Sequence, residues 1–209
     1  GLGDYDRDDG YVQGAVTYEY ETRTLTQDRG RKFQLDAMDV DETNFGIAAA
    51  NVMSEFQRMH VVPEIDAYRL SKLATTAITA GNSEEYDPNI STITSKFIEH
   101  IYGIADKGIP EDMLVAHISY PVYATLISND EIKKQIDVVT FSSGVVETRV
   151  RSINGVVLIP TVSSRMKSAY VFYDGSTTGQ EAGGFVPDDS AVDVNWIIMS
   201  RRAPIAVQK

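Results

Sequence analysis

The chain has 209 residues, of which 43% are hydrophobic and 23% charged, an ordinary globular composition with enough length for a sizeable core. The net charge of −11 argues against a surface built to bind nucleic-acid phosphates, and the lack of cysteine excludes disulfides and thiolate metal sites. No apolar run reaches the about 18 residues that suggest a membrane span, and no signal peptide is recognisable.

Residues 11–40 predict a long two-stranded β-hairpin, and the interpretation of the whole chain depends on them. The side chains alternate with the period of a strand that has one covered and one wet face. One side carries Val16, Tyr18, Tyr20, Thr22 and Thr24, and the other carries Thr17, Glu19, Glu21 and Arg23. Gly30 closes the predicted turn at 27–30 because glycine readily takes a positive φ. The predicted return strand at 31–40 alternates in the same way.

Such a hairpin needs cover, because an isolated two-stranded ribbon is marginal in water. The neighbouring sequence offers no third strand. Either a later segment of the same chain covers the hairpin or another chain does. In the second case the hairpin is a projecting arm that lies on a neighbouring molecule.

An amphipathic helix is predicted directly after the hairpin. Acidic and polar residues at 39–44 suit a helix start, where backbone N–H groups are free; a metal site is the alternative use of the same acids, and capping is favoured. The apolar stripe expected to form the helix core includes Phe45, Val52, Met53 and Phe56. Pro63 is predicted to end this helix. A second helix follows from about residue 64 and ends at Gly81-Asn82.

The middle of the chain predicts the alternation of helix, strand and helix that is typical of α/β structure. A polar loop at 83–90 precedes a third helix that begins at Ser91 or Thr92 and stops at 108–110. The nearly continuous apolar run at 113–118 is typical of a strand buried on both faces, and 119–121 opens another helix. The composition changes near residue 85, which is the candidate subdomain boundary.

The last part of the chain predicts β-structure. Asn154-Gly155 between two apolar runs is the strongest hairpin signal in the sequence. The segment 141–144 is interpreted as a turn and 175–184 as a flexible loop. Short strands are predicted at 169–173 and at 192–199, around the single tryptophan Trp196, and the residues after 205 still resemble a strand.

A search for chemistry yields no catalytic, cofactor-binding or metal-binding residues. The three histidines, His60, His100 and His117, lie in different predicted elements without metal-ligand spacing. His117, inside an apolar strand, is interpreted as a core histidine. The sequence has no nucleophile elbow and no phosphate-binding loop. An enzyme is therefore the less favoured class.

The predicted hairpin tip carries a basic cluster on an acidic protein. The tip residues are Asp28, Arg29, Arg31 and Lys32. They could be solvated charges that discourage edge-to-edge aggregation. The favoured interpretation is an inter-subunit contact, in which complementary charges between copies set the register of assembly.

Several stretches in a fixed order resemble a branch of the tailed-bacteriophage major capsid proteins. They are Tyr18-Glu-Tyr-Glu-Thr-x-Thr, Asp28-Arg-Gly-x-Lys-Phe, Asp36-Ala-Met-Asp-Val-Asp-Glu-Thr, Val62-Pro-Glu-Ile-Asp-Ala-Tyr-Arg, and residues 115–123, 150–160 and 201–207. Together they cover most of the chain.

The resemblance implies an α+β chain with the tailed-phage major capsid shell fold. Residues 1–10 would be a flexible lead-in, 11–40 the extended β-hairpin loop that lies across an adjacent subunit, 41–88 the peripheral domain with a long spine helix, 89–190 the α/β axial domain, and 191–209 the return strand to the peripheral domain. Relatives usually carry further N- and C-terminal sequence. We therefore expect this chain to be a trimmed fragment or the product of a decayed prophage gene.

The function implied is that of a structural coat protein of a tailed phage or prophage. It would self-assemble as pentamers and hexamers into an icosahedral head that encloses double-stranded DNA without reading its sequence. It would be made in the bacterial cytoplasm and reside in the virion. Other copies would be its main partners, with a scaffolding protein or a protease as further candidates, and no cofactor or membrane is expected. The alternatives are an encapsulin-like shell protein of a cellular nanocompartment and an unrecognised enzyme.

Overall fold

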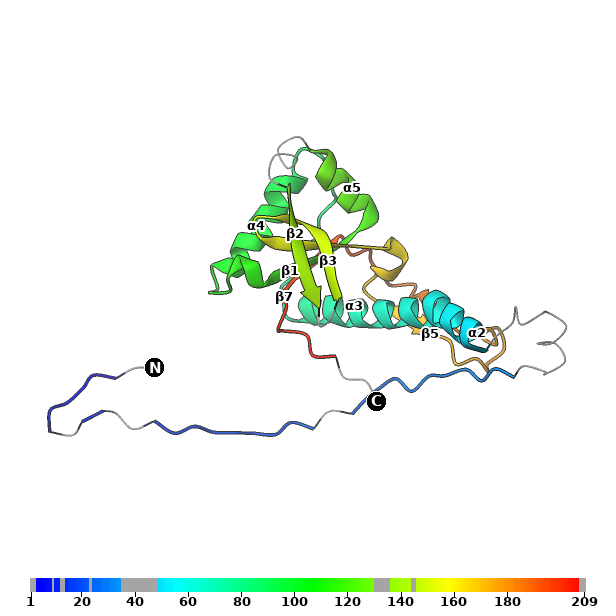
Figure 1. Ribbon diagram of the computed structural model, residues 1–209, viewed down its shortest axis with the longest axis horizontal. Helices are drawn as coiled ribbons and strands as arrows, with labels where there is room; N and C mark the ends of the chain where they lie inside the picture. Colours follow the sequence, from blue (N-terminus) through cyan, green and yellow to red (C-terminus); the bar gives the residue numbers. More distant parts are fainter. Residues whose placement is uncertain are drawn as a thin grey trace. The chain divides into compact units, whose positions relative to one another are not determined.

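The computed structural model describes residues 3–8, 10–11, 14–22, 24–34, 49–129, 136–143 and 146–206, with backbone alone for 49, 136–143 and 146–150 (Figure 1). The chain divides into two compact units, residues 1–47 and 48–209. The proposed axial domain and the described part of the proposed peripheral domain both fall in the second unit.

The predicted N-terminal hairpin does not form in the part of unit 1–47 that the structure describes. Residues 14–22 and 24–34 contain no strand, and Figure 1 draws them as irregular chain. The isolated bridge between Asp6 and Gly10 closes a small turn before them. The hairpin prediction is thus wrong for these residues of the single chain. The physical reason is that two strands without a third layer bury too little apolar surface to offset the conformational entropy lost when they become ordered.

The predicted break at Pro63 is wrong, because helical geometry runs through it. Helix α2 spans Ala49–Phe56, a π-helical segment η1 spans Gln57–Val61, and α3 spans Val62–Thr79. A proline lacks the N–H for the helical bond, and its ring clashes with the carbonyl four residues earlier. The wider π-helical turn, in which the Val62 N–H donates to the Gln57 carbonyl, relieves that clash. The predicted start at 39–44 lies outside the described residues.

Helix α3 buries one face against the C-terminal half of the unit. Its buried residues Ala67, Leu70, Ser71 and Ala74 follow helical spacing. The helix contacts the short 3₁₀ segment η3 (Ser163–Arg165) and strand β5 (Tyr170–Phe172). As predicted, it ends before Gly81, which takes a φ of +69°.

A mixed five-stranded sheet forms the centre of unit 48–209. Its order is β2 (Ile136–Ser143), β3 (Val146–Ile153), β4 (Val156–Thr161), β1 (Leu114–Ser119) and β7 (Trp196–Ser200). Strands β1 and β4 are parallel, and the other neighbours are antiparallel. The buried strand at 113–118 is confirmed as β1. The Asn154-Gly155 hairpin is confirmed as β3 and β4, with positive φ at both turn residues. Strand β2 was missed, and residues 141–143 belong to it rather than to a turn.

The core lies between this sheet and the two helices α4 (Ile93–Ala105) and α5 (Tyr120–Ser128). The chain order α4, β1, α5 confirms the predicted sequence of helix, strand and helix. Alternate residues of β1, Leu114, Ala116 and Ile118, are fully buried in it. They pack with Phe97 and Ile101 of α4. Burial of each of the larger side chains among them contributes about 1.5–3 kcal/mol.

The C-terminal strands differ in detail from the prediction. β5 pairs with β6 (Phe185–Pro187), a strand that was not predicted. β7 begins at Trp196, later than expected, because 192–194 pairs elsewhere: the Ser168 N–H donates to the Val192 carbonyl and the Val194 N–H to the Met166 carbonyl. No strand occurs at 201–206, and the last residues lie outside the described part. The α+β class is confirmed, and no described helix is both long and apolar enough to cross a membrane.

Candidate functional site

The described segment 14–34 exposes large apolar and aromatic side chains. Val16 is 97% exposed, Tyr18 79% and Tyr20 86%. These three residues share one side of the period-two pattern, so an extended backbone would present them together. Contiguous exposed apolar groups of this kind mark interaction surfaces.

The predicted tip residues lie within the same segment. Asp28, Arg29, Arg31 and Lys32 are all exposed, and the chain around them is neither helix nor strand. The structure therefore keeps these charges accessible but does not form the turn that was expected to present them.

The predicted core stripe of the spine helix is only partly covered. Val52 and Phe56 are half-buried, Met53 is 46% exposed, and Phe45 lies outside the described residues. The placement of Met53 in the core is therefore wrong for the single chain. Residues 50–61 contain no buried side chain, and the buried residues of this continuous helical stretch lie on α3.

The three histidines lie in three different elements, His60 in η1, His100 in α4 and His117 in β1. His60 is exposed, with its ring 5.2 Å from that of Phe56. His117 is half-buried on β1, and its Nδ1 lies 3.4 Å from Thr161 Oγ1. Burial lowers the pKa of His117, and the charge of Asp66 opposes this shift. Among the described residues, no group of acidic or histidine side chains could hold a metal ion.

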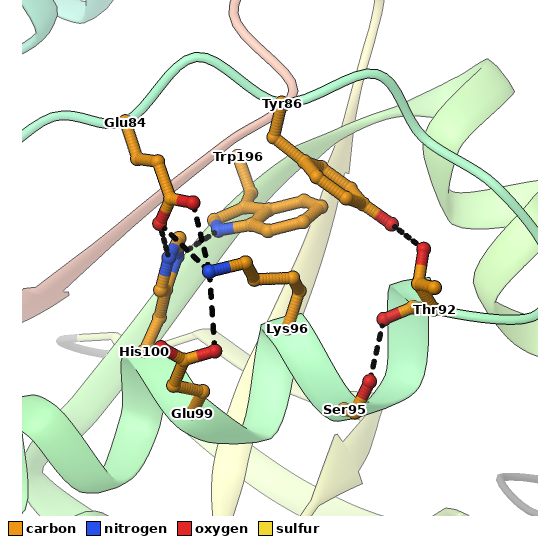
Figure 2. Close-up of polar contacts among 8 residues, drawn as sticks. All are labelled: Glu84, Tyr86, Thr92, Ser95, Lys96, Glu99, His100 and Trp196. Carbon is orange, nitrogen blue, oxygen red and sulfur yellow. Dashed lines mark hydrogen bonds and ion pairs between the residues drawn. The ribbon is translucent and has the colours of Figure 1, made fainter.

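A polar cluster, which we call the Trp196 cluster, joins three segments of unit 48–209. Its members are Glu84 and Tyr86 from the connection between α3 and α4, Thr92, Lys96 and His100 from the start and body of α4, and Trp196 from β7. Figure 2 shows the indole of Trp196 between Tyr86 and His100. The indole Nε1–H donates to His100 Nδ1 at 3.0 Å, and His100 Nε2 lies 3.2 Å from Glu84 Oε2.

Ion pairs complete the cluster. Lys96 Nζ lies 2.7 Å from Glu84 Oε1 and 3.2 Å from Glu99 Oε2. Hydrogen bonds from Lys96 and then His100 lower the pKa of Glu84, and hydrogen bonds to Glu84 and then Glu99 raise the pKa of Lys96. Sequence reasoning missed this cluster, because His100 and Trp196 are 96 positions apart and no spacing signals their contact.

An open depression of about 670 Å³ lies beside the connection at 85–88 and residues 193–195. Its acidic residues are Glu85, Asp87 and Asp193, and Asp193 pairs with Lys167 at 2.6 Å. Ser119 and Ser163 contribute hydroxyls, and no histidine lines the depression beside them. The lining therefore lacks the pairing of serine and histidine found in many acyl-transfer sites.

No family model, curated protein or solved structure matches this chain. The functional argument therefore rests on the chain's own residues. These offer exposed apolar side chains and exposed charges in 14–34, and unit 48–209 has a core of its own.

Proposed function

We propose that this chain is a structural shell subunit of the tailed-phage major capsid kind, in which residues 14–34 belong to an arm that packs across a neighbouring copy. Copies would form pentamers and hexamers of a closed shell around double-stranded DNA. The observation that carries the proposal is the exposure of Val16, Tyr18 and Tyr20 on one side of a strand-like pattern.

The energetics favour completion of the arm by a second molecule. Covering one large apolar side chain contributes about 1.5–3 kcal/mol, and Tyr18 and Tyr20 are mostly uncovered in the single chain. A strand added to another sheet or ribbon also pairs its backbone N–H and C=O groups. Assembly thus provides the third layer that the isolated ribbon lacks.

The test separates the two sides of the arm in the full-length gene product. The variant Val16→Ser/Tyr18→Ser/Tyr20→Ser removes the apolar side, and the matched control Thr17→Ser/Glu19→Gln/Glu21→Gln changes the opposite side. Assembly is followed by sedimentation velocity and electron microscopy. We expect the first variant to remain as unassembled subunits and the control to form particles. Particle formation by the first variant at the wild-type rate would contradict the proposal.

The contents of purified particles test the kind of shell. Genomic double-stranded DNA supports a phage head, whereas an enclosed enzyme supports a cellular nanocompartment. Because both shells would need the arm, this measurement is independent of the variants above.

A further inference from the structure

The imidazole of His100 is the point where three segments of unit 48–209 meet. On one side it bonds Glu84, which belongs to the connection 80–92 between α3 and α4. On the other side it bonds Trp196, the first residue of β7. Figure 2 shows the ring held between the two partners.

The bond to Trp196 fixes the protonation state of the ring. An indole N–H can only donate, so His100 Nδ1 must carry a lone pair to accept it. The ring proton then resides on Nε2, where it points to the Glu84 carboxylate at 3.2 Å. Both hydrogen bonds exist together only in the neutral Nε2–H tautomer.

We propose that His100 is a pH-sensitive latch, which fastens the 80–92 connection and β7 to α4 while neutral and releases Trp196 when protonated. A proton added to Nδ1 would face the indole N–H across the present 3.0 Å separation. Two donors cannot bond each other, so one ring must move away. This inference does not depend on the proposed function.

The surrounding charges determine which bond breaks. Glu84 favours the imidazolium form, and Lys96, paired with Glu84 at 2.7 Å, opposes it. Glu99 reaches the cluster through Lys96, and β7 contributes the uncharged indole. The bond to Glu84 becomes charge-assisted on protonation and strengthens. The bond to Trp196 is therefore the one that is lost.

Movement of the indole would reach the connection through Tyr86. The Tyr86 and Trp196 ring centroids lie 5.5 Å apart. The Tyr86 carbonyl accepts a hydrogen bond from Asn195 Nδ2 at 2.7 Å, and its hydroxyl lies 2.9 Å from Thr92 Oγ1. The connection, the start of α4 and the residue before β7 are thus linked around one ring.

The chain contains a single tryptophan, so its indole N–H gives one resonance in a proton–nitrogen NMR spectrum. We expect this resonance in the intact chain to move between pH 8 and pH 5, the range in which histidines change charge. In His100→Asn, an amide oxygen can occupy the place of Nδ1 without titrating. Its indole resonance should stay near the neutral position throughout.

Glu84→Gln provides a second, independent variant, because loss of the carboxylate disfavours the imidazolium. Its transition should shift to lower pH. Amide hydrogen exchange at 195–197, around the start of β7, should be faster in wild type than in His100→Asn at pH 5, with far-UV circular dichroism confirming that both remain folded. An indole resonance that stays constant while His100 titrates would overturn the proposal. An indole resonance that moves equally in wild type and His100→Asn would also overturn it. So would a transition of Glu84→Gln at the same pH as that of wild type.

Discussion

Deletion of residues 12–39 should separate the folding of the chain from its assembly. At most about a fifth of the Val16, Tyr18 or Tyr20 side chain is covered in the single chain. At about 2 kcal/mol for complete burial of each, these three side chains together contribute less than about 1 kcal/mol to the isolated fold. All residues of the buried core of unit 48–209 lie outside the deleted range. Leu25 and Phe33, which the deletion also removes, are 51% and 39% exposed, and their covered parts add about 2 kcal/mol at the same rate. We therefore expect the free energy of unfolding to fall by at most about 3 kcal/mol.

Urea unfolding, followed by far-UV circular dichroism and by Trp196 fluorescence, measures the free energy of unfolding. Sedimentation velocity of the same variant in the full-length gene product measures assembly, and we expect loss of capsomers. A large loss of stability would show that the arm is part of the monomer fold. Capsomers formed without the arm would refute its linking role.

Three further predictions concern unit 48–209. Thr94→Val should raise the free energy of unfolding by about 1 kcal/mol, because the buried Thr94 Oγ1 has no hydrogen-bond partner; a loss of stability in urea unfolding would contradict this. Gly155→Ala should lower the free energy of unfolding by about 1–2 kcal/mol, because φ at this turn is +79°. Gly103→Ala, in open space on α4, should raise it by about 0.5–1 kcal/mol. Urea unfolding of the two variants should therefore show changes of opposite sign. Burial lowers the pKa of His117 despite nearby Asp66, so this histidine favours folding above its unfolded value of about 6.5 and opposes it as the pH falls below that value. The free energy of unfolding of wild type should therefore fall more steeply than that of His117→Gln from pH 7 to pH 5, and parallel curves would contradict the assignment.

The elements that could be predicted from the sequence are those fixed by local patterns. Helices α4 and α5 carry apolar residues at helical spacing, and β1 is a continuous apolar run typical of a buried strand. Asn154-Gly155 dictates a tight turn through its backbone preferences alone. Strand β6 could not be predicted, because three residues are too short to show a period. The late start of β7 reflects bonds to residues 166 and 168, which no local pattern reveals.

Pro63 and the Trp196 cluster show two different limits of local reasoning. The rule that proline ends a helix did not hold at Pro63, because a π-helical turn accommodates both the missing hydrogen bond and the proline ring. In the Trp196 cluster there was no local signal, since the contact between His100 and Trp196 arises only when the sheet places β7 beside α4. A local change of helical geometry thus removed a predicted boundary in one case, and longer-range packing created a polar site in the other.

Segment 14–34 differs from both, because its local pattern is strong and the single chain does not realise it. Sequences that fold well show agreement between local preference and final structure, and disagreements concentrate at functional sites. Polar residues on both sides would be sufficient for a segment that only needed to stay solvated, whereas Val16, Tyr18 and Tyr20 occupy one side at a cost in solubility. An alternating strand pattern with no strand in the described segment is what a sequence selected in the presence of a neighbouring copy would retain. The mismatch therefore supports strand formation coupled to assembly over an arm that remains irregular in all states.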